Sequence, residues 1–165
     1  MTWQPGRDRI IALLEADELQ RVTADVDIAQ LLLDDAGRHL ATAAAASLSG
    51  DLSGAYQLAY DALRKSAASL LEVQGLRATS RGGHIAIQEA AQAQFGSTVR
   101  AFRSFSRIRR ARNTFEYPRT DAPGPSPDDV CDAITTATQA RDAAVTILYQ
   151  DVLTLWQQLT DETEA

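Results

Sequence analysis

The sequence has little of what several classes of protein depend on. Its one cysteine, Cys131, excludes an internal disulfide and leaves no ligand set for structural zinc, which takes about four ligands. Aromatic residues make up 6% of the chain, which disfavours a β protein because strands prefer aromatic and β-branched residues. No stretch approaches the ~20 apolar residues that cross a bilayer, and residues 1–8 do not resemble a signal peptide. We therefore expect a cytoplasmic protein with no metal, no cofactor and no membrane contact.

What the chain does contain favours packed helices. Of its 165 residues 45% are hydrophobic and 23% are charged, which lies within the globular range. Alanine, the strongest helix former, is abundant, whereas glycine and proline are few. This length supports a single domain with a proper core. The composition therefore predicts an all-α fold.

Hydrophobic spacing divides the chain into helices. We expect a short N-terminal helix and about five main helices. Their ranges are 7–21, 26–48, 51–75, 84–95, from Ser97 or Thr98 to Tyr117, and from Pro127 to about Leu159. No strand is predicted. This organisation gives an N-terminal helical extension (1–24), a helical domain (25–160) and a frayed tail (161–165).

Local signals set several of these boundaries. Asp25 or Asp27 is a plausible N-cap for the second helix, and Gly75 is expected to end the third because glycine takes left-handed geometry easily. Residues 119–127 carry three prolines and form the one clear linker. Ser126 followed by Pro127 starts the last helix well. On that helix, Tyr149, Leu153 and Trp156 form a second face that leaves room for a dimer.

One segment reverses the charge of its surroundings. The whole chain carries a net charge of −6, yet residues 100–112 contain six arginines and no acid. An arginine cluster of this kind suits phosphate without reading base sequence. The simpler interpretation is a solvated face with an Arg112–Glu116 helix pair, worth only about 0.3–0.5 kcal/mol. If the cluster binds phosphate, the candidate residues are Arg103, Arg107, Arg109, Arg110 and Arg112.

Three blocks of sequence resemble the HEPN superfamily (higher eukaryotes and prokaryotes nucleotide-binding). They are residues 55–65, AYQLAYDALRK; residues 83–96, GHIAIQEAAQAQFG; and residues 109–118, RRARNTFEYP. With the flanking helices they span about residues 25–160. The resemblance implies a HEPN-like helical bundle that often dimerises with its motif helices side by side.

The same resemblance implies a range of functions. Many HEPN proteins are metal-independent endoribonucleases, often toxins paired with a nucleotidyltransferase-type antitoxin or parts of phage defence. Their motif is an arginine, commonly followed by a polar residue, with a histidine four to six residues after the arginine. Arg112 and Asn113 match its first half, but Tyr117 lies where the histidine is expected. A tyrosine with its ordinary pKa of about 10 is a poor base at neutral pH.

The two histidines of the chain, His39 and His84, lie elsewhere. We expect His84 to cap or pack at a helix start, and His39 to be a core or interface residue. Tyr56 and Tyr60 are expected in the core, where they could also orient the motif. Without a motif histidine, efficient catalysis is not expected.

Three hypotheses follow. In the first, the protein belongs to a bacterial toxin–antitoxin or phage-defence module and binds RNA, a nucleotide or a partner protein through a dimeric arginine groove. In the second, it is an endoribonuclease whose site is Arg112, Asn113, Glu116 and Tyr117. In the third, it is a helical scaffold without nucleic acid. A variant has Tyr117 accept a nucleotidyl group from a partner enzyme.

Overall fold

The computed structural model describes residues 3–156 and shows an all-α fold. The helices are α1 (Arg7–Glu15), α2 (Val26–Leu48), α3 (Leu52–Val73), α4 (Gly83–Phe95), α5 (Arg100–Arg103), α6 (Phe105–Glu116) and α7 (Pro127–Tyr149). Two short strands, β1 (Leu19–Arg21) and β2 (Leu76–Ala78), complete the described elements. Within residues 3–156, no helix combines the length and the apolar character that a membrane span requires.

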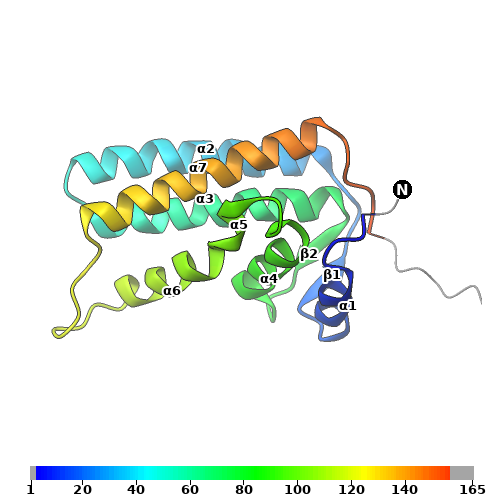
Figure 1. Ribbon diagram of the computed structural model, residues 1–165, viewed down its shortest axis with the longest axis horizontal. Coiled ribbons are helices and arrows are strands. Elements are labelled where there is room, and N and C mark those ends of the chain that lie inside the picture. Colours follow the sequence, from blue (N-terminus) through cyan, green and yellow to red (C-terminus); the bar gives the residue numbers. More distant parts are fainter. Residues whose placement is uncertain (1–2, 157–165) are drawn as a thin grey trace, which may run out of the picture.

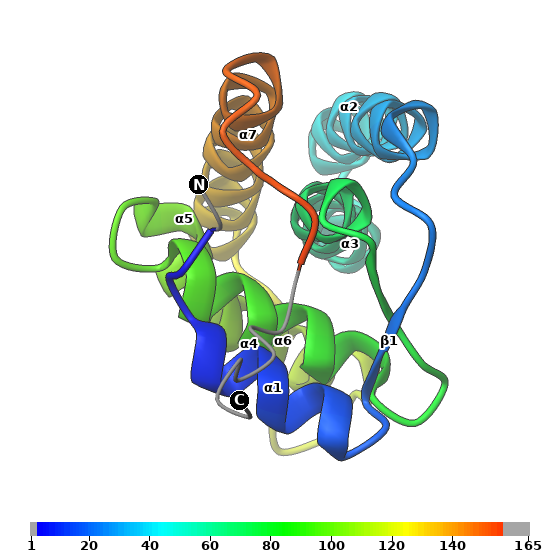
Figure 2. The same ribbon diagram turned by 90° about the vertical axis from the view of Figure 1, so that its right-hand side faces the viewer.

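Three long helices, α2, α3 and α7, run side by side as one layer of the molecule (Figure 1). Viewed along the bundle, α1, α4 and α6 lie together beneath them (Figure 2). Helix α3 contacts α2 and α7 on one side and α4 and α6 on the other, so it is the centre of the fold. Its buried Ala55, Ala59, Ala62 and Ala67 leave room for these neighbours to approach closely.

The predicted starts of the long helices are confirmed. Asp25 accepts a hydrogen bond from the backbone of the first turn of α2 (3.0 Å), and Asp51 does the same for α3 (2.8 Å). At α7, Ser126 and Asp129 form a reciprocal capping box. The hydrogen bonds from Ser126 hold the pKa of Asp129 below its usual value. Each cap satisfies backbone N–H groups that the first turn leaves unpaired.

The prediction of a helix over 7–21 and of no strand is wrong. Helix α1 ends at Glu15, and Asp17 adopts left-handed geometry (φ 60°). Leu19–Arg21 then pairs antiparallel with Leu76–Ala78. The strand forms because its partner, almost sixty residues later, offers backbone hydrogen bonds and a buried position for Leu19. Gly75 (φ 70°) ends α3 as predicted and leads into β2.

The arginine-rich segment is not one helix capped by Ser97 or Thr98. It begins after Val99, which makes no side-chain cap, and it is interrupted at Ser104 between α5 and α6. Phe102 and Phe105, on either side of the interruption, are both fully buried. Phe102 and Phe105 therefore reach the core from two separate short helices.

The last helix ends earlier than predicted. Helix α7 stops at Tyr149, and Asp151 takes left-handed geometry (φ 50°). The chain then turns back and buries Trp156, whose backbone N–H donates to the carbonyl of Gln74 (2.8 Å). The proposed dimer face does not form, because Trp156 is buried and lies off the helix while Tyr149 is 92% exposed. Leu155 is half exposed, and Leu159 lies outside the described residues.

This returning segment also joins the N-terminal part of the chain. The backbone N–H of Trp3 donates to the hydroxyl of Thr154 (3.3 Å), and Arg21 donates to the carbonyl of Trp156 (2.9 Å). The ring of Trp3 packs on Phe95 at the end of α4 (5.5 Å between centroids). Segments from the two ends of the sequence therefore complete the same region of the fold.

Candidate phosphate-binding site

Basic side chains of α4 and α6 flank the ring of Tyr60, and the charges of further arginines act on its phenol. The guanidinium carbon of Arg112 lies 5.4 Å from the ring centroid, and the imidazole of His84 lies 6.0 Å from it. Burial raises the pKa of the Tyr60 phenol, and the charges of Arg64, Arg112 and Arg109 oppose that rise. We call these five residues the Tyr60 cluster. In a chain with net charge −6, it is a place where positive groups of separate helices converge.

Arg112 is held rigidly at the edge of this cluster. Its Nε donates to Gln57 on α3 (2.7 Å), and its Nη1 donates to Asn113 (3.2 Å). Glu116 binds both terminal nitrogens, one of them at 3.0 Å. The side chain is 21% exposed. The guanidinium is therefore fixed over the Tyr60 ring, with an edge open to solvent.

Apolar packing of α6 brings these arginines to α3. Phe105 meets Tyr60 edge-on (6.1 Å between centroids), and Phe115 meets Tyr56 in the same way (4.9 Å). Ile108 lies between them and is fully buried. The expectation that both tyrosines lie in the core beneath the motif is confirmed. Because α6 is fixed by this face, residues 109 and 112 must lie beside α3 and α4.

The five arginines predicted to bind phosphate do not share one surface. Arg109 donates to a buried glutamine of α4 (2.5 Å) and belongs with Arg112. Arg103 donates instead to the backbone just after α4 (3.0 Å), and Arg107 pairs with an aspartate of α7 (2.8 Å). Arg110 is exposed, and its side chain makes no hydrogen bond or ion pair within residues 3–156. The structure therefore brings together two of the five.

Of the four residues predicted for catalysis, three lie together. Arg112, Asn113 and Glu116 are joined by the hydrogen bonds described above. Tyr117 is the C-cap of α6 and is 71% exposed. No hydrogen bond links its hydroxyl to the described residues. The arginines of α6 are therefore not arranged to activate this tyrosine.

His84 lies closer to the site than the sequence suggested. It stands in the first turn of α4. Burial lowers its pKa from the ordinary 6.5, and the charges of Arg64 and Arg112 lower it further, against the opposing effects of Asp61 and Glu116. The imidazole is therefore neutral at pH 7. A neutral imidazole among guanidinium groups can accept a proton.

Sequence reasoning missed Gln57 and Arg64. Both lie on α3, one turn before and one turn after Tyr60, so spacing from a buried tyrosine is the signal that could have found them. Arg64 donates to Asp61 through two nitrogens (3.1 and 2.8 Å). His39, on α2, lies 3.6 Å from the same aspartate and is thus at an interface between helices.

Comparison with protein-family models, with curated proteins and with solved structures found no match to this chain. Among residues 3–156, no three His, Cys, Asp or Glu side chains are grouped in a way that could hold a metal ion.

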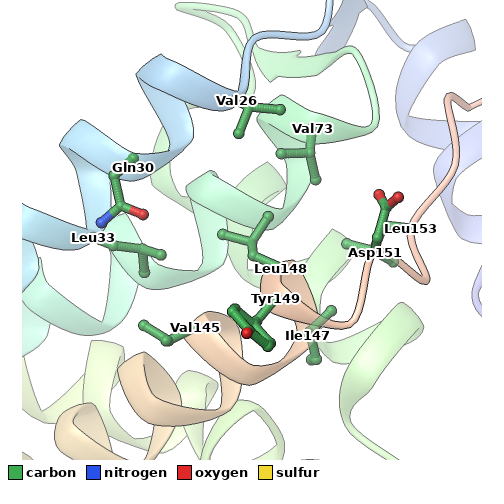
Figure 3. Close-up of a pocket in the computed structure, with 10 residues that line it drawn as sticks. All are labelled: Val26, Gln30, Leu33, Val73, Val145, Ile147, Leu148, Tyr149, Asp151 and Leu153. Carbon is green, nitrogen blue, oxygen red and sulfur yellow. The ribbon is translucent and has the colours of Figure 1, made fainter.

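An apolar hollow lies away from the Tyr60 cluster. It measures about 320 Å³ and is formed where α2 begins and α3 and α7 end (Figure 3). Val26, Val73 and Leu148 line it, and Tyr149 stands at its edge (Figure 3). It has neither arginine nor histidine in its lining, so it is not part of the phosphate-binding site.

Proposed function

We propose that this protein binds the phosphate backbone of RNA through the Tyr60 cluster and does not cleave it efficiently. The observation that carries this proposal is the guanidinium of Arg112, fixed 5.4 Å from the centre of the Tyr60 ring in an acidic chain, with Arg64 and Arg109 near enough for their charges to act on the same phenol. Planar guanidinium groups match phosphate oxygens in geometry and in charge. The resemblance to HEPN proteins supports the same ligand class.

The chemistry of the cluster favours contact with the backbone over contact with the bases. Tyr60 is 2% exposed and covered by Arg112, so its ring is not available to stack on a base. Phosphate contacts fix the position of a nucleic acid without carrying sequence information. A phosphate that approaches Arg112 must compete with Glu116, which is itself about one-third exposed and free to turn away.

The arrangement of Tyr117 supports binding over cleavage. A phenol could act as a base near pH 7 only if neighbouring cations lowered its pKa strongly. The phenol of Tyr117 is instead largely in solvent at the end of α6. Tyr117, which occupies the position of the motif histidine, is therefore poorly placed for proton transfer.

Fluorescence anisotropy with a labelled single-stranded RNA tests the proposal. We expect binding at low salt, with an affinity that falls as the salt concentration rises. If Arg64, Arg109 and Arg112 each neutralise one phosphate, the plot of log affinity against log salt concentration has a slope of about −2, since each phosphate contributes about −0.7 on single strands. The RNA should keep its length on a denaturing gel. An uncharged oligonucleotide analogue of the same sequence is the control. Absence of binding at low salt, or equal binding of the analogue, would refute the proposal.

The proposal extends to the setting in which the protein works. We propose a homodimer in a bacterial toxin–antitoxin or phage-defence module, with a nucleotidyltransferase-type protein as a candidate partner. The exposed end of α6, from Asn113 to Tyr117, supports a contact between two copies at the motif. Sedimentation equilibrium tests it: a monomer at all concentrations, with and without RNA, contradicts the dimer.

His84 supports a second candidate function, a metal-independent endoribonuclease. Its neutral imidazole could take the proton of an RNA 2′-hydroxyl. The 2′-oxygen would attack phosphorus, and the 5′-oxygen would leave with a proton from water. Arg112 would neutralise the phosphate in the transition state. This role differs from the one predicted for Tyr117.

A pair of histidine variants separates the two functions. If the protein cleaves RNA, His84→Gln abolishes cleavage but, because the neutral imidazole contributes no charge, keeps the RNA binding made by the arginines, whereas His39→Gln, the matched control, retains both. Because the pKa of His84 lies below 6.5, the wild-type rate should fall only when the pH drops below that value. Equal rates for His84→Gln and wild type, or no shortened RNA at any pH, exclude His84 as the base.

A further inference from the structure

A polar hollow of about 230 Å³ lies between the α5–α6 segment and α7. Arg100 and Ser104 line it from one side, and Thr136 and Gln139 line it from the other. The Tyr60 cluster lies between α6 and the helices α3 and α4, and it shares no residue with this hollow. The hollow is therefore a separate place where a ligand could meet arginines of the same segment.

Hydrogen-bond donors around the hollow lack protein partners. Arg100 makes no side-chain hydrogen bond or ion pair within the described part of the chain, and neither do the side chains of Ser104, Thr136 and Gln139. Thr136 is only 7% exposed. These unpaired donors face one small volume.

The charges at the hollow define the ligand further. Arg107 also lines it and gives one terminal nitrogen, Nη1, to Asp132 (2.8 Å), which leaves its Nε and Nη2 without a partner among residues 3–156. With Arg100, the lining has two cations and one anion, so its net charge is +1. This balance favours an anion over a cation.

We propose that this hollow binds a phosphate group. Two guanidinium groups, hydroxyls and an amide supply donors from both sides, and the oxygens of a phosphate accept from several such donors at once. The volume of the hollow suits a small group. The phosphate could belong to a free phosphate monoester or to an RNA backbone. The carboxylate of Asp132, which pairs with Nη1 of Arg107, then competes with the phosphate for that guanidinium.

The first test is a titration of the full chain with inorganic phosphate, followed by ¹H–¹⁵N NMR. We expect saturable shifts of the backbone amides of Ser104 and Thr136. Arg100→Ala should weaken binding about tenfold, the loss typical of a charge-assisted contact. Arg110→Ala removes the same charge from a neighbouring position off the hollow and should change affinity less than about twofold. Equal weakening by the two variants would overturn the proposal.

The second test uses a variant that should tighten phosphate binding instead of weakening it. Asp132→Asn removes the competing carboxylate and should tighten phosphate binding about threefold or more. Asp128→Asn, an exposed acid at the start of the same helix, is the control for overall charge and should have a smaller effect. Both residues are exposed, so neither change should disturb folding. If Asp132→Asn weakens binding, or matches the control, the hollow is not the phosphate site.

RNA identifies the source of the phosphate. If a short RNA competes with inorganic phosphate and shifts the same amides, the ligand is a backbone phosphate. If the RNA does not compete, the ligand is a free phosphate monoester. Either conclusion requires that inorganic phosphate itself saturates the hollow. Arg112→Ala should leave phosphate binding at the hollow unchanged. If RNA does not bind at the Tyr60 cluster, phosphate binding in the hollow still stands. If phosphate does not bind in the hollow, RNA binding at the Tyr60 cluster still stands.

Discussion

Arg112→Ala is expected to weaken RNA binding about ten- to hundredfold at low salt, because a charge-assisted contact contributes roughly 1.5–3 kcal/mol. The variant removes the guanidinium that is fixed over Tyr60 and held by Gln57 and Glu116. It should also make the salt dependence shallower, since one fewer phosphate is neutralised. Fluorescence anisotropy with single-stranded RNA at several salt concentrations measures both changes.

Two further variants make this prediction specific. Arg112→Lys keeps the charge but loses the planar fork, so it should recover only part of the affinity. Arg110→Ala removes an exposed arginine whose side chain has no protein partner in the described residues, and it should cost much less. If Arg110→Ala and Arg112→Ala weaken binding equally, the effect is one of overall charge and the Tyr60 cluster is not the site.

Phe105→Ala should have the largest effect on stability. Phe105 is fully buried at the start of α6 and supports the ring of Tyr60. Removing a buried phenylalanine ring loses its transfer free energy and leaves a cavity, at a cost of about 3–5 kcal/mol. We expect the melting temperature to fall by about 10 °C, measured by calorimetry or by circular dichroism.

Phe115→Ala is the matched comparison on the same helix. Phe115 also meets a tyrosine edge-on, but it is only partly buried. Less area is returned to water, so the loss should be about half as large or less. A loss at Phe115 equal to that at Phe105 would mean that burial of the α6 face does not set its stability.

The elements that the sequence predicts well are those with local causes. Helices α2, α3 and α7 begin where Asp25, Asp51 and Ser126 can accept hydrogen bonds from the next turn, and such a cap needs no distant partner. The strand at Leu19–Arg21 has no such local cause, because it forms only against Leu76–Ala78. The early end of α7 likewise depends on the burial of Trp156 elsewhere in the fold.

The candidate site shows the same division. The Arg112–Glu116 pair follows from a spacing of four residues on a helix, and the structure confirms it. The contacts of Arg112 with Gln57 and Tyr60 require α6 to lie across α3, more than fifty residues earlier in the chain. The interruption at Ser104 also separates arginines that an unbroken helix would have kept in phase.

The contacts between the two ends of the chain have a consequence for synthesis on the ribosome. Trp3 and Thr154 are 151 positions apart, and Arg21 is 135 positions from Trp156. Domains emerge N-terminus first at about 5–20 residues per second, so Trp3 and Arg21 leave the ribosome several seconds before the segment to which they bond exists. The contact of the Trp3 indole with Phe95 can form earlier, but these two hydrogen bonds cannot. Native structure at this end of the molecule is therefore completed after translation of residue 156.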